Sequence, residues 1–454
     1  MKKLLITAHH QFISKNIIFS GVVDALIAHG FQVYIAVPEL KHEYFKTALK
    51  SKKITPVVIK RAGFVSKLDA IFRRIFITLQ SSHYWEYKRK EITPGVRSEL
   101  YAKVTKYVNL KFFPTQLLIR ILRWLFNLIP ISVDPVTRKI INEMDVVLLT
   151  DIYLEEDITI GKIAKKLDKL TVGMVRSWDN CYSKGILRIL PDFCLVNNNV
   201  IKNELSSMHS YPRNRIEVVG MPQFDGFINN KRTCRAEFFN KLGIPENKKL
   251  ILFAPAGKIL SDTDSDICEM LNDIANDSLH EENLHVLVRN HPGHPADLNK
   301  CDSFKNFTIQ TPGTKFDTID KYSELTQLEQ DYLADLLYHS SIVIYVATTL
   351  GVDSLVFDKP QIVINFDGYK EKSYFESVKR YHDEQHMEQY LNSGVASVVD
   401  SKLQLLSEIE KYIKNPTYKS LERDKEKERQ ITNYLGSSVD KLSTSLIDIV
   451  SEKI

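Results

Sequence analysis

The sequence lacks the features that mark secreted or membrane-spanning proteins. Its cysteines (Cys181, Cys194, Cys234, Cys268 and Cys301) are odd in number, scattered, and form no CxxC pair, which argues against a disulfide framework and a structural zinc site. No window reaches the roughly 18 uncharged apolar residues of a spanning helix, and the apolar run in MKKLLITAHH is too short for a secretory signal. We therefore expect a cytoplasmic protein, either soluble or peripheral to a membrane.

Several motifs of nucleotide-dependent and hydrolytic enzymes are also missing. The sequence contains no GxGxxG after its first apolar run, no GxxxxGK[ST] and no GxSxG. These absences argue against a dinucleotide dehydrogenase, a P-loop nucleotidase and an α/β-hydrolase. His291 and His294 lie three residues apart beside a proline, but no HExxH or carboxylate partner accompanies them. We therefore expect neither a metal site nor a bound cofactor.

The overall charge is modest but unevenly distributed. A formal net charge of +5 over 454 residues, without a basic arm or acidic tail, gives no reason to expect a nucleic-acid partner. Between about Lys52 and Lys139, however, 18 Lys or Arg face five Asp or Glu, a net charge of +13 that leaves about −8 on the rest. Within residues 64–131, Arg120 and Arg123 share one face of an apolar helix. That helix is either an anionic-membrane contact or a core helix whose arginines reach out to water.

The order of apolar runs predicts an α/β protein with parallel sheets. Runs of four to seven apolar residues alternate with helical patterns in both halves of the chain. The pattern predicts two Rossmann-like domains facing across a cleft. Ligands of such sheets gather at the carboxyl ends of the strands. The expected boundaries are 1–226 for the first domain, with a basic insertion at about 52–139, then 227–245 for a linker, 246–400 for the second domain and 401–454 for helices that pack back on the first.

One stretch, residues 342–367, combines a strand, a polar turn, a helix and a second strand. Thr348 and Thr349 fill the turn, and the helix begins near Leu350. Two hydroxyls and the free amides of a helix start suit an anion such as a diphosphate. The alternative is an ordinary βαβ corner with threonine capping, in which Asp353 only complements the helix dipole.

Polar clusters follow seven of the expected strands, which indicates a lined edge in each half. They are His9 with His10; Asp151; Arg176, Trp178, Asp179 and Asn180; Lys258; Arg289 with His291; Thr348 with Thr349; and Asp367. The clusters of the second half are mainly donors for a charged diphosphate. Those of the first half, including at most one of the two adjacent histidines, could remove a proton from a hydroxyl. His291 could alternatively be a structural histidine in a His-Pro turn.

Several segments resemble GT-B glycosyltransferases, and most closely the CDP-glycerol glycerophosphotransferase-like branch. LFAPAGK, VRNHPGH, YVATTLGVDSLVFDKPQIVINFD and YLNSGVASVVD stand in the order of that family. SWDNCYSKG and VVGMPQFDGF resemble its loop and domain-closing segment in the first half. The resemblance runs from about Asp145 to the end of the chain. It implies the GT-B fold, with the last helix crossing back to the first domain, and transfer from a nucleotide donor without a metal.

The resemblance also implies roles for particular residues. By the resemblance, the donor's diphosphate or its attached group would meet His291, Thr348, Thr349 and Asp353, with Lys258 close by. From the residue pattern we add Arg289, Gly351 and Asp367 to the expected donor side. The base would be His10 or His9, with Asp151 and Asp179 as further catalytic candidates. Trp178, Asn180 and Gln223 would line the acceptor side or the cleft. The family often has an Asp-Tyr-Ser-Ser run where this chain has Ala347-Thr348-Thr349, and an arginine near Lys258, so a nucleotide sugar stays open as donor.

From these observations we expect a glycosyltransferase that moves a sugar from a nucleotide-sugar donor to a hydroxyl of a bacterial-type surface glycan or lipid-linked glycan. It would act in the cytoplasm, at the inner face of the membrane if the basic segment binds lipid. Three alternatives remain open at this point. They are a CDP-glycerol-dependent glycerophosphotransferase, a non-hydrolysing sugar-nucleotide epimerase, and a glycan-binding protein without catalytic activity.

Overall fold

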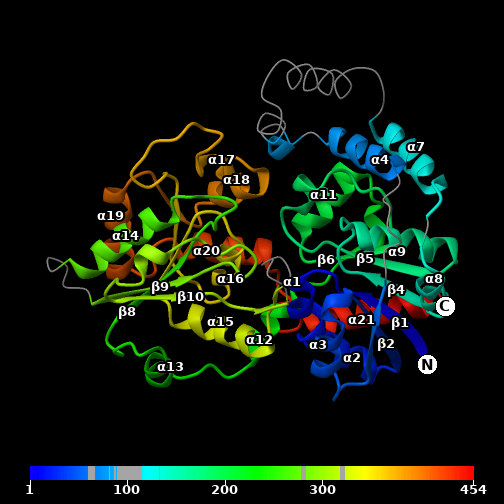
Figure 1. Ribbon diagram of the computed structural model, residues 1–454, viewed down its shortest axis with the longest axis horizontal. Helices are drawn as coiled ribbons and strands as arrows, with labels where there is room; N and C mark the ends of the chain where they lie inside the picture. Colours follow the sequence, from blue (N-terminus) through cyan, green and yellow to red (C-terminus); the bar gives the residue numbers. More distant parts are fainter. Residues whose placement is uncertain are drawn as a thin grey trace. The chain divides into compact units, whose positions relative to one another are not determined.

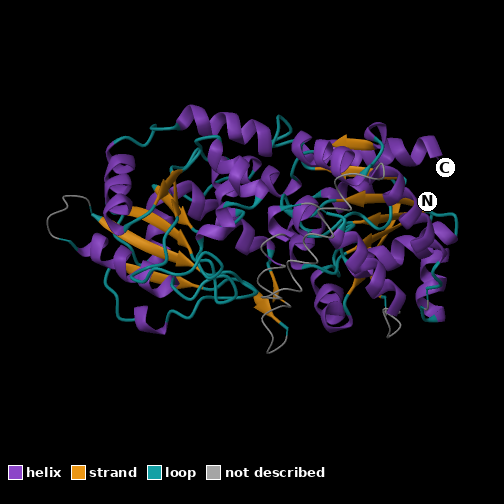
Figure 2. Ribbon diagram, turned by 90° about the horizontal axis from the view of Figure 1, so that it is seen from above, coloured by secondary structure: helices purple, strands orange, loops and turns teal. Residues whose placement is uncertain are grey.

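The structure is a computed structural model that describes residues 1–59, 67–80, 82–85, 88, 115–131, 133–277, 283–316 and 323–453. The chain forms two compact units (Figure 1). The first unit comprises residues 1–223 and 432–454, and the second comprises residues 224–431. Each unit contains one large sheet with helices on its faces (Figure 2).

The sheet of the first unit has seven parallel strands in the order β3-β2-β1-β4-β5-β6-β7. Its strands are β1 Lys2–Thr7, β2 Phe31–Val37, β3 Ile54–Val58, β4 Val146–Leu149, β5 Leu170–Met174, β6 Phe193–Val196 and β7 Ile216–Val218. In register, Ile6 of β1 pairs with Ile35 of β2 and Leu148 of β4. All four residues of β4 are buried, as expected for a parallel strand with helices on both faces.

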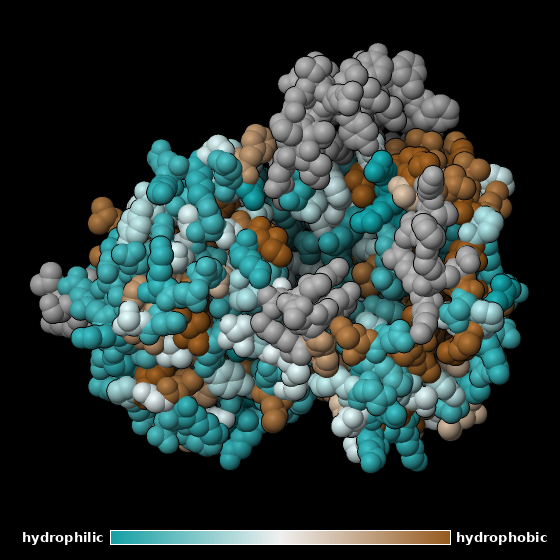
Figure 3. Space-filling view, viewed as in Figure 1, coloured by the Kyte–Doolittle hydropathy of each residue, from teal (hydrophilic) through white to brown (hydrophobic). Residues whose placement is uncertain are grey.

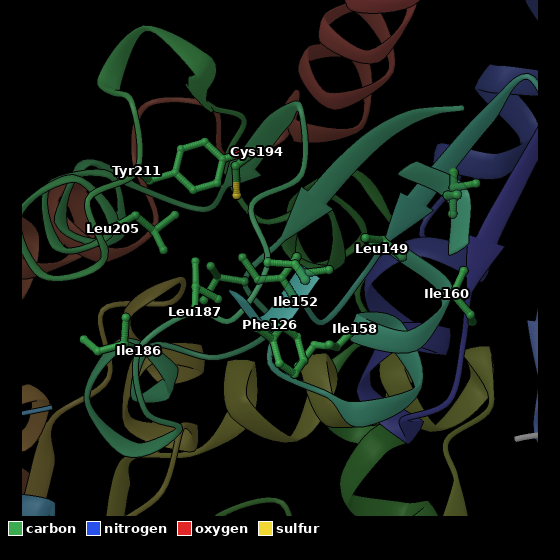
Figure 4. Close-up of a cluster of buried hydrophobic side chains, with 14 of the residues drawn as sticks. Phe126, Leu149, Ile152, Ile158, Ile160, Ile186, Leu187, Cys194, Leu205 and Tyr211 are labelled. Carbon is green, nitrogen blue, oxygen red and sulfur yellow. The ribbon is translucent and has the colours of Figure 1, made fainter. Parts of the chain in front are cut away.

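Side chains alternate between two hydrophobic clusters on opposite faces of this sheet. Leu5 and Leu149 belong to the cluster drawn in Figure 4, whereas Leu4 and Leu148 belong to the other. The helical segments of this unit are α1 Gln11–Ile13, the π-helix η1 Ser14–Ile18, α2 Val22–Ala28, η2 Glu39–Lys41, α3 His42–Ala48, α4 Lys67–Thr78, α7 Thr115–Leu128, α8 Pro135–Asn142, α9 Glu155–Lys166, α10 Asn180–Ser183, α11 Asn199–His209, η3 Arg213–Arg215 and α21 Ser438–Lys453. A short 3-10 helix, η4 Pro222–Phe224, spans the boundary between the units.

The last helix, α21, belongs to the first unit, which confirms the expectation that the chain crosses back. Leu442 and Leu446 of α21 lie in the same buried cluster as Val22 of α2. The Met221 N–H donates to the Ser438 hydroxyl at 3.1 Å, and Lys2 Nζ donates to the Val450 carbonyl at 3.2 Å. The final turns of the chain thus complete one face of the first sheet.

The second unit contains a sheet of six parallel strands in the order β10-β9-β8-β13-β14-β15. These strands are β8 Lys249–Ala254, β9 Leu284–Arg289, β10 Phe307–Gln310, β13 Ile342–Tyr345, β14 Gln361–Ile364 and β15 Ser397–Val399. A separate antiparallel pair joins β11 Thr314–Lys315 to β12 Ser323–Glu324.

Helices cover this second sheet. They are α12 Asp225–Asn229, α13 Arg235–Leu242, α14 Asp264–Asn276, η5 Asn299–Cys301, α15 Gln327–His339, α16 Leu350–Leu355, α17 Lys379–His382, α18 Gln385–Asn392, α19 Lys402–Lys414 and α20 Ser420–Gln430. Thr326 and Glu329 form a capping box that fixes the start of α15. Leu271 of α14 and Leu405 of α19 pack in one cluster with Ile251 of β8.

The structure departs from three expected boundaries. The segment expected as a linker, 227–245, contains most of α12 and all of α13, which belong to the second unit because Phe238 and Phe239 are buried there. Helices α19 and α20 also stay with the second unit rather than packing on the first. The expected insertion contains β3, which is a strand of the first sheet. Its Pro56 and the lysines on either side hide the strand pattern in the sequence. Much of the insertion between these elements, including 89–114, lies outside the described residues.

The expectation that Arg120 and Arg123 share an outward face of α7 is wrong. Arg123 is buried, and its Nε donates to the Leu187 carbonyl at 2.8 Å while its Nη2 donates to the His209 carbonyl. Burial lowers the pKa of Arg123 to about 10, so it stays charged at neutral pH. The guanidinium faces inward because two buried carbonyls need donors there.

His209 makes the first unit sensitive to acid. Its Nδ1 accepts from the Leu187 N–H at 3.2 Å, so the neutral ring carries its proton on Nε2, which lies 3.1 Å from the Cys181 carbonyl. Burial, reinforced by the charge of Arg123, lowers the pKa of His209 from 6.5 to about 3. As the pH falls below 6.5, His209 therefore becomes protonated in the unfolded state while its buried ring stays neutral in the folded state.

We predict that lowering the pH from 7 to 5 reduces the free energy of unfolding by about 2 kcal/mol through His209. Urea unfolding at a series of pH values measures the loss, and His209→Gln should flatten the curve in that range. His29→Gln, which changes an exposed histidine, is the matched control and should keep the wild-type slope. Identical slopes in all three proteins would contradict the prediction.

Candidate functional site

His9 and Asp157 form a buried pair at the carboxyl edge of the first sheet. His9 lies in the loop after β1, and its Nδ1 lies 3.6 Å from Asp157 Oδ1. The other oxygen of Asp157, which lies on α9, accepts from the Thr7 hydroxyl at 2.7 Å and from the Asp151 N–H at 2.8 Å. Burial raises the pKa of the Asp157 carboxyl, and His9 opposes that rise. A proton on His9 Nδ1 is therefore directed toward a carboxylate, which leaves Nε2 as the basic nitrogen.

His10 has the opposite arrangement of ring nitrogens. Its Nδ1 accepts from the Phe12 N–H at 3.2 Å and caps the short helix α1. Because a backbone N–H can only donate, the neutral ring of His10 carries its proton on Nε2. Geometry thus separates the two adjacent histidines, because His9 Nδ1 faces a carboxylate whereas His10 Nδ1 accepts a backbone N–H.

A small pocket lies at the ends of several strands of the first unit. Polar and apolar side chains from several strand ends and from η1 line it, including Asn16, Thr150, Arg176, Asn197, Met221 and Pro222. Arg176 Nε donates to Asp151 Oδ2 at 2.7 Å, so Asp151 is a partner of this arginine. The buried Asn16 Oδ1 has no hydrogen-bond donor among the described residues. A π-helix in one wall is a feature often found at functional sites.

The other expected residues of the first unit lie in the loop after β5 and at the end of the unit. Trp178 precedes α10, and Asp179 accepts from the Ser183 hydroxyl at 2.7 Å, a bond within that helix. Asn180 is fully buried, and its amide makes no hydrogen bond to any described residue. Gln223 lies in η4, where the chain leaves the first unit for the second. Asp179 stands at the N-terminal end of α10 and binds the hydroxyl of its last residue.

In the second unit, the loop after β8 is held tightly against the loop after β9. Both oxygens of Asp264 accept backbone N–H groups, from Ala256 at 2.9 Å and Gly257 at 2.8 Å. Burial raises the pKa of Asp264 to about 6. Gly257 has a φ of +84°, and a Cβ there would lie 2.3 Å from the His294 carbonyl oxygen. Lys258, next in the chain, is exposed, and its charge adds to burial in lowering the pKa of His294.

Arg289, the last residue of β9, is a buried cation. Its guanidinium lies 5.7 Å from the centroid of the Tyr332 ring, and no described residue accepts a hydrogen bond from it. Burial lowers its pKa, whereas Tyr332, Glu329 and Asp353 favour the charge. A buried guanidinium normally fills its five N–H donors, so Arg289 retains capacity to bind an anion.

His291 and His294 stack in the loop that follows. Their ring centroids are 3.7 Å apart with an interplanar angle of 41°. His291 Nδ1 accepts from the Gly293 N–H at 3.0 Å, which fixes the proton of its neutral ring on Nε2. The ring therefore serves the turn through one nitrogen and offers a donor through the other. Both the structural and the binding interpretation of His291 are compatible with this geometry.

Around α16 the structure distinguishes residues that the sequence grouped together. The Thr348 hydroxyl accepts from the Leu350 N–H at 3.3 Å, while Thr349 is exposed. Gly351 faces the core, where a Cβ would lie 2.5 Å from the Tyr345 hydroxyl oxygen. Packing thus accounts for this glycine. Asp353 is buried in the helix, and its charge stabilises the Arg289 cation.

Asp367 has a structural partner. Its Oδ1 accepts from the Val378 N–H at 2.8 Å, and the residue is buried. Nearby, the ring of His382 joins two strand ends, with Nε2 lying 2.9 Å from the Val346 carbonyl and Nδ1 2.8 Å from Asn365 Oδ1. These contacts fix the segments that leave β13 and β14.

Sequence reasoning did not identify three residues that organise these edges. Asp157 lies inside a helix rather than after a strand, Asp264 is the first residue of α14, and His382 lies far along the chain. The acidic run DTDSD at residues 262–266, where α14 begins, is the signal for Asp264 in the sequence. In the described part of the chain no three His, Cys, Asp or Glu side chains cluster as a metal site requires. That the protein works without a metal ion stays a prediction.

Comparison with known proteins identifies the family. A family model described as CDP-Glycerol:Poly(glycerophosphate) glycerophosphotransferase matches residues 175–445. The chain belongs to this family. No curated protein matches the sequence. The family is one of transferases, and the match includes every donor-side residue named above.

Solved structures agree on the fold. The UDP-GlcNAc 2-epimerase from Neisseria meningitidis bound to UDP-GlcNAc is 13% identical, covering 99% of this chain and 100% of its own, with a TM-score of 0.56. The S. aureus MnaA–UDP structure is 11% identical, covering 99% and 97%, with a TM-score of 0.54. The wall teichoic acid polymerase TagF with CDPG is 12% identical, covering 100% and 89%, with a TM-score of 0.54. These likenesses confirm the expected GT-B fold.

Gly257 gives a test of how rigidly the second-unit loops are built. We predict that Gly257→Ala lowers the unfolding free energy by about 2 kcal/mol or more, because a Cβ meets a carbonyl oxygen in addition to the strain of a positive φ. Gly243→Ala is the matched control, since Gly243 has a φ of +67° but nothing within 4 Å of its Cβ position. That control should cost about 1 kcal/mol. Equal losses in urea unfolding would contradict the close approach of the two loops.

Proposed function

We propose that this member of the family transfers glycerol phosphate from a CDP-linked donor to a hydroxyl of a surface polymer. The family match supports the donor class. The single observation that carries the assignment of a diphosphate to the second unit is the buried Arg289, for which the described residues supply no hydrogen-bond acceptor. The acceptor is a glycan or a lipid-linked glycan, and the protein works in the cytoplasm at the inner face of the membrane.

The second unit supplies the donor side. Arg289 provides a cation that burial makes more effective, because charge interactions strengthen where water is excluded. Lys258 and the outer nitrogen of His291 lie in loops that leave the same edge of the sheet. Together these groups would neutralise the charge that develops on a departing nucleotide.

The first unit supplies the base. His9 Nε2 takes the proton of the acceptor hydroxyl, and the resulting imidazolium is stabilised by Asp157 on the other side of the ring. The acceptor oxygen then forms a bond to the phosphorus that carries glycerol. The bond from that phosphorus to the bridging oxygen breaks, and CMP leaves with the electron pair.

A nucleotide sugar is the second candidate donor. The Ala347-Thr348-Thr349 turn differs from the Asp-Tyr-Ser-Ser run frequent in the family, and one of the structures with this fold holds UDP-GlcNAc. In that reaction the acceptor oxygen would bond to the anomeric carbon, and a nucleoside diphosphate would leave. An epimerase would instead change the donor without any acceptor, and a glycan-binding protein would bind no nucleotide.

A donor panel tests the transferred group. We predict that CDP-glycerol raises the melting temperature of the protein and that CMP is released only when acceptor is present. Arg289→Met should weaken donor binding at least about tenfold while the protein stays folded. If a UDP-sugar instead raised the melting temperature and gave a nucleoside diphosphate as product, the donor would be a nucleotide sugar and not CDP-glycerol. Conversion of donor without acceptor would indicate an epimerase, and no shift with any nucleotide would contradict the transferase proposal.

A pair of variants tests the base. We predict that His9→Gln lowers turnover by about 100-fold or more, because general-base catalysis is worth that much. His10→Asn should keep most activity, since asparagine preserves the capping acceptor for the Phe12 N–H. Donor binding, measured separately, should be unchanged in both. The reverse pattern, with loss only in His10→Asn, would move the base to His10.

A further inference from the structure

A polar cavity of about 580 Å³ lies beside β7, the last strand of the first sheet. Its volume falls within the roughly 300–1,000 Å³ of pockets that hold small molecules. Four elements of the first unit form its wall: the start of α11, strand β7, helix α21, and residues 432–437, which lead from the second unit into α21. We call it the return cavity. Its wall includes Asn199, Lys202, Glu217, Thr432, Tyr434 and Lys441.

The wall of the return cavity has a net positive charge. Lys202 and Lys441 supply two ammonium groups, and Glu217 supplies a carboxylate. Lys441 Nζ lies 3.8 Å from Glu217 Oε2, which is longer than a hydrogen bond, and no described residue accepts a hydrogen bond from Lys202 Nζ. Helix α11 adds to the positive potential, because its first turn contains no acidic residue. The wall therefore retains capacity to bind an anion.

Uncharged polar groups accompany these cations. Asn199 contributes an amide, and Thr432 and Tyr434 contribute hydroxyl groups. Amides and hydroxyls can both donate to and accept from the alcohol groups of a ligand. The carboxylate of Glu217 accepts hydrogen bonds from alcohols but repels a bare anion. This composition suits a molecule that has a phosphate at one end and hydroxyl groups at the other.

The segment that leads into α21 is held in a fixed conformation. Thr432 has a φ of +70°, which is rare for a β-branched residue. The Tyr434 N–H donates to the Thr432 hydroxyl at 3.4 Å, and the Tyr434 carbonyl accepts from the Ser438 hydroxyl at 2.9 Å. A Cβ at Gly220 would lie 2.4 Å from that Ser438 oxygen. The wall is thus preorganised at a cost in backbone strain, and proteins retain such strain mainly where they bind ligands.

The exposed apolar surface of the first unit lies on other elements. Apolar colouring gathers over α4 and α7 in Figure 3, where Trp124 and Leu128 are 61% and 59% exposed. Among the described residues no helix has both the length and the apolarity needed to cross a bilayer. Neither α4 nor α7 contributes to the wall of the return cavity, which is therefore a separate feature of this unit.

One loop joins the return cavity to the strand ends of the first sheet. Three asparagines follow β6: Asn197 lines the small pocket at the strand ends, and Asn198 caps α11 by accepting from the Ile201 N–H at 3.0 Å. Asn199, the third, lines the return cavity. A ligand of the cavity is therefore either a free small molecule or one unit of a longer acceptor that also occupies the strand ends.

We propose that the return cavity binds a phosphorylated polyol. Lys202 and Lys441 donate to the phosphate, and Glu217 accepts from the hydroxyl groups. Two sources share this chemistry, namely a free polyol phosphate and a polyol phosphate unit within the acceptor polymer. Only the second source rests on the proposed transfer reaction, and neither depends on the donor, because every wall residue belongs to the first unit.

Titration calorimetry with glycerol 3-phosphate tests the proposal on the full chain without any nucleotide. Each protein is measured with Arg289 and as Arg289→Met, so that anion binding in the second unit is recognised. We predict saturable binding in both, and Lys202→Ala/Lys441→Ala should lower the affinity at least about tenfold. The control Lys300→Ala/Lys305→Ala removes the same charge from exposed positions of the second unit and should bind like its parent.

Two further probes, inorganic phosphate and a glycerol phosphate trimer, define the ligand. Glycerol 3-phosphate should bind more tightly than inorganic phosphate, and Glu217→Ala should narrow that difference. A trimer that binds more tightly than the monomer, and loses this advantage in the lysine variant, would identify an acceptor unit. Equal or weaker binding of the trimer would identify a free polyol phosphate.

Three results would overturn the proposal. They are no binding of glycerol 3-phosphate or the trimer, unchanged affinity in the lysine variant, and equal wild-type affinity for glycerol 3-phosphate and inorganic phosphate. Unchanged thermal unfolding of the lysine variant shows that its fold is kept, because neither lysine is buried. Binding in the return cavity without any response to CDP-glycerol would contradict the proposed donor and leave this site in place.

Discussion

Parallel pairing of the strands is the constraint on which the remainder of this structure depends. Because all strands of each large sheet run the same way, every loop that follows a strand leaves from one edge. The faces of both sheets are filled by helices, so polar side chains can gather only at the edges and in the helix ends. His9, Asp151 and Arg176 share one edge for this reason, and Arg289, His291 and Thr348 share the other.

Each edge also contains a buried charge whose environment is incompletely neutralised. Asp157 accepts from a hydroxyl and a backbone amide, yet its second oxygen has only the nearby His9 ring. Arg289 has a ring and two carboxylates nearby, but none of the described residues accepts a hydrogen bond from it. Groups of this kind cost folding free energy, and proteins retain them where they do chemistry. The two buried charges have opposite signs, one in each unit.

The edges themselves could be predicted from the sequence, but the roles of neighbouring residues could not. Apolar runs located nearly every strand, and polar clusters directly after them gave His9, Arg289 and Thr348. Distinguishing His9 from His10 requires knowing which ring nitrogen meets a backbone N–H and which meets Asp157, a residue about 150 positions away. Gly351 and Asp367 were grouped with the donor residues. In the structure Gly351 packs closely against Tyr345, and Asp367 accepts a hydrogen bond from the Val378 N–H.

Helix α7 shows the same limit in another form. From the sequence, the side with Arg120 and Arg123 reads as the polar face, since arginines usually point to water. Two backbone carbonyls inside the unit reverse this for Arg123, because only a long cationic side chain can reach and satisfy both. With the arginine drawn inward, the outward surface consists largely of tryptophan, leucine and isoleucine. Such a surface is stable beside lipid and costly in water, so the inward hydrogen bonds and the outward apolar stripe are two consequences of one helix orientation.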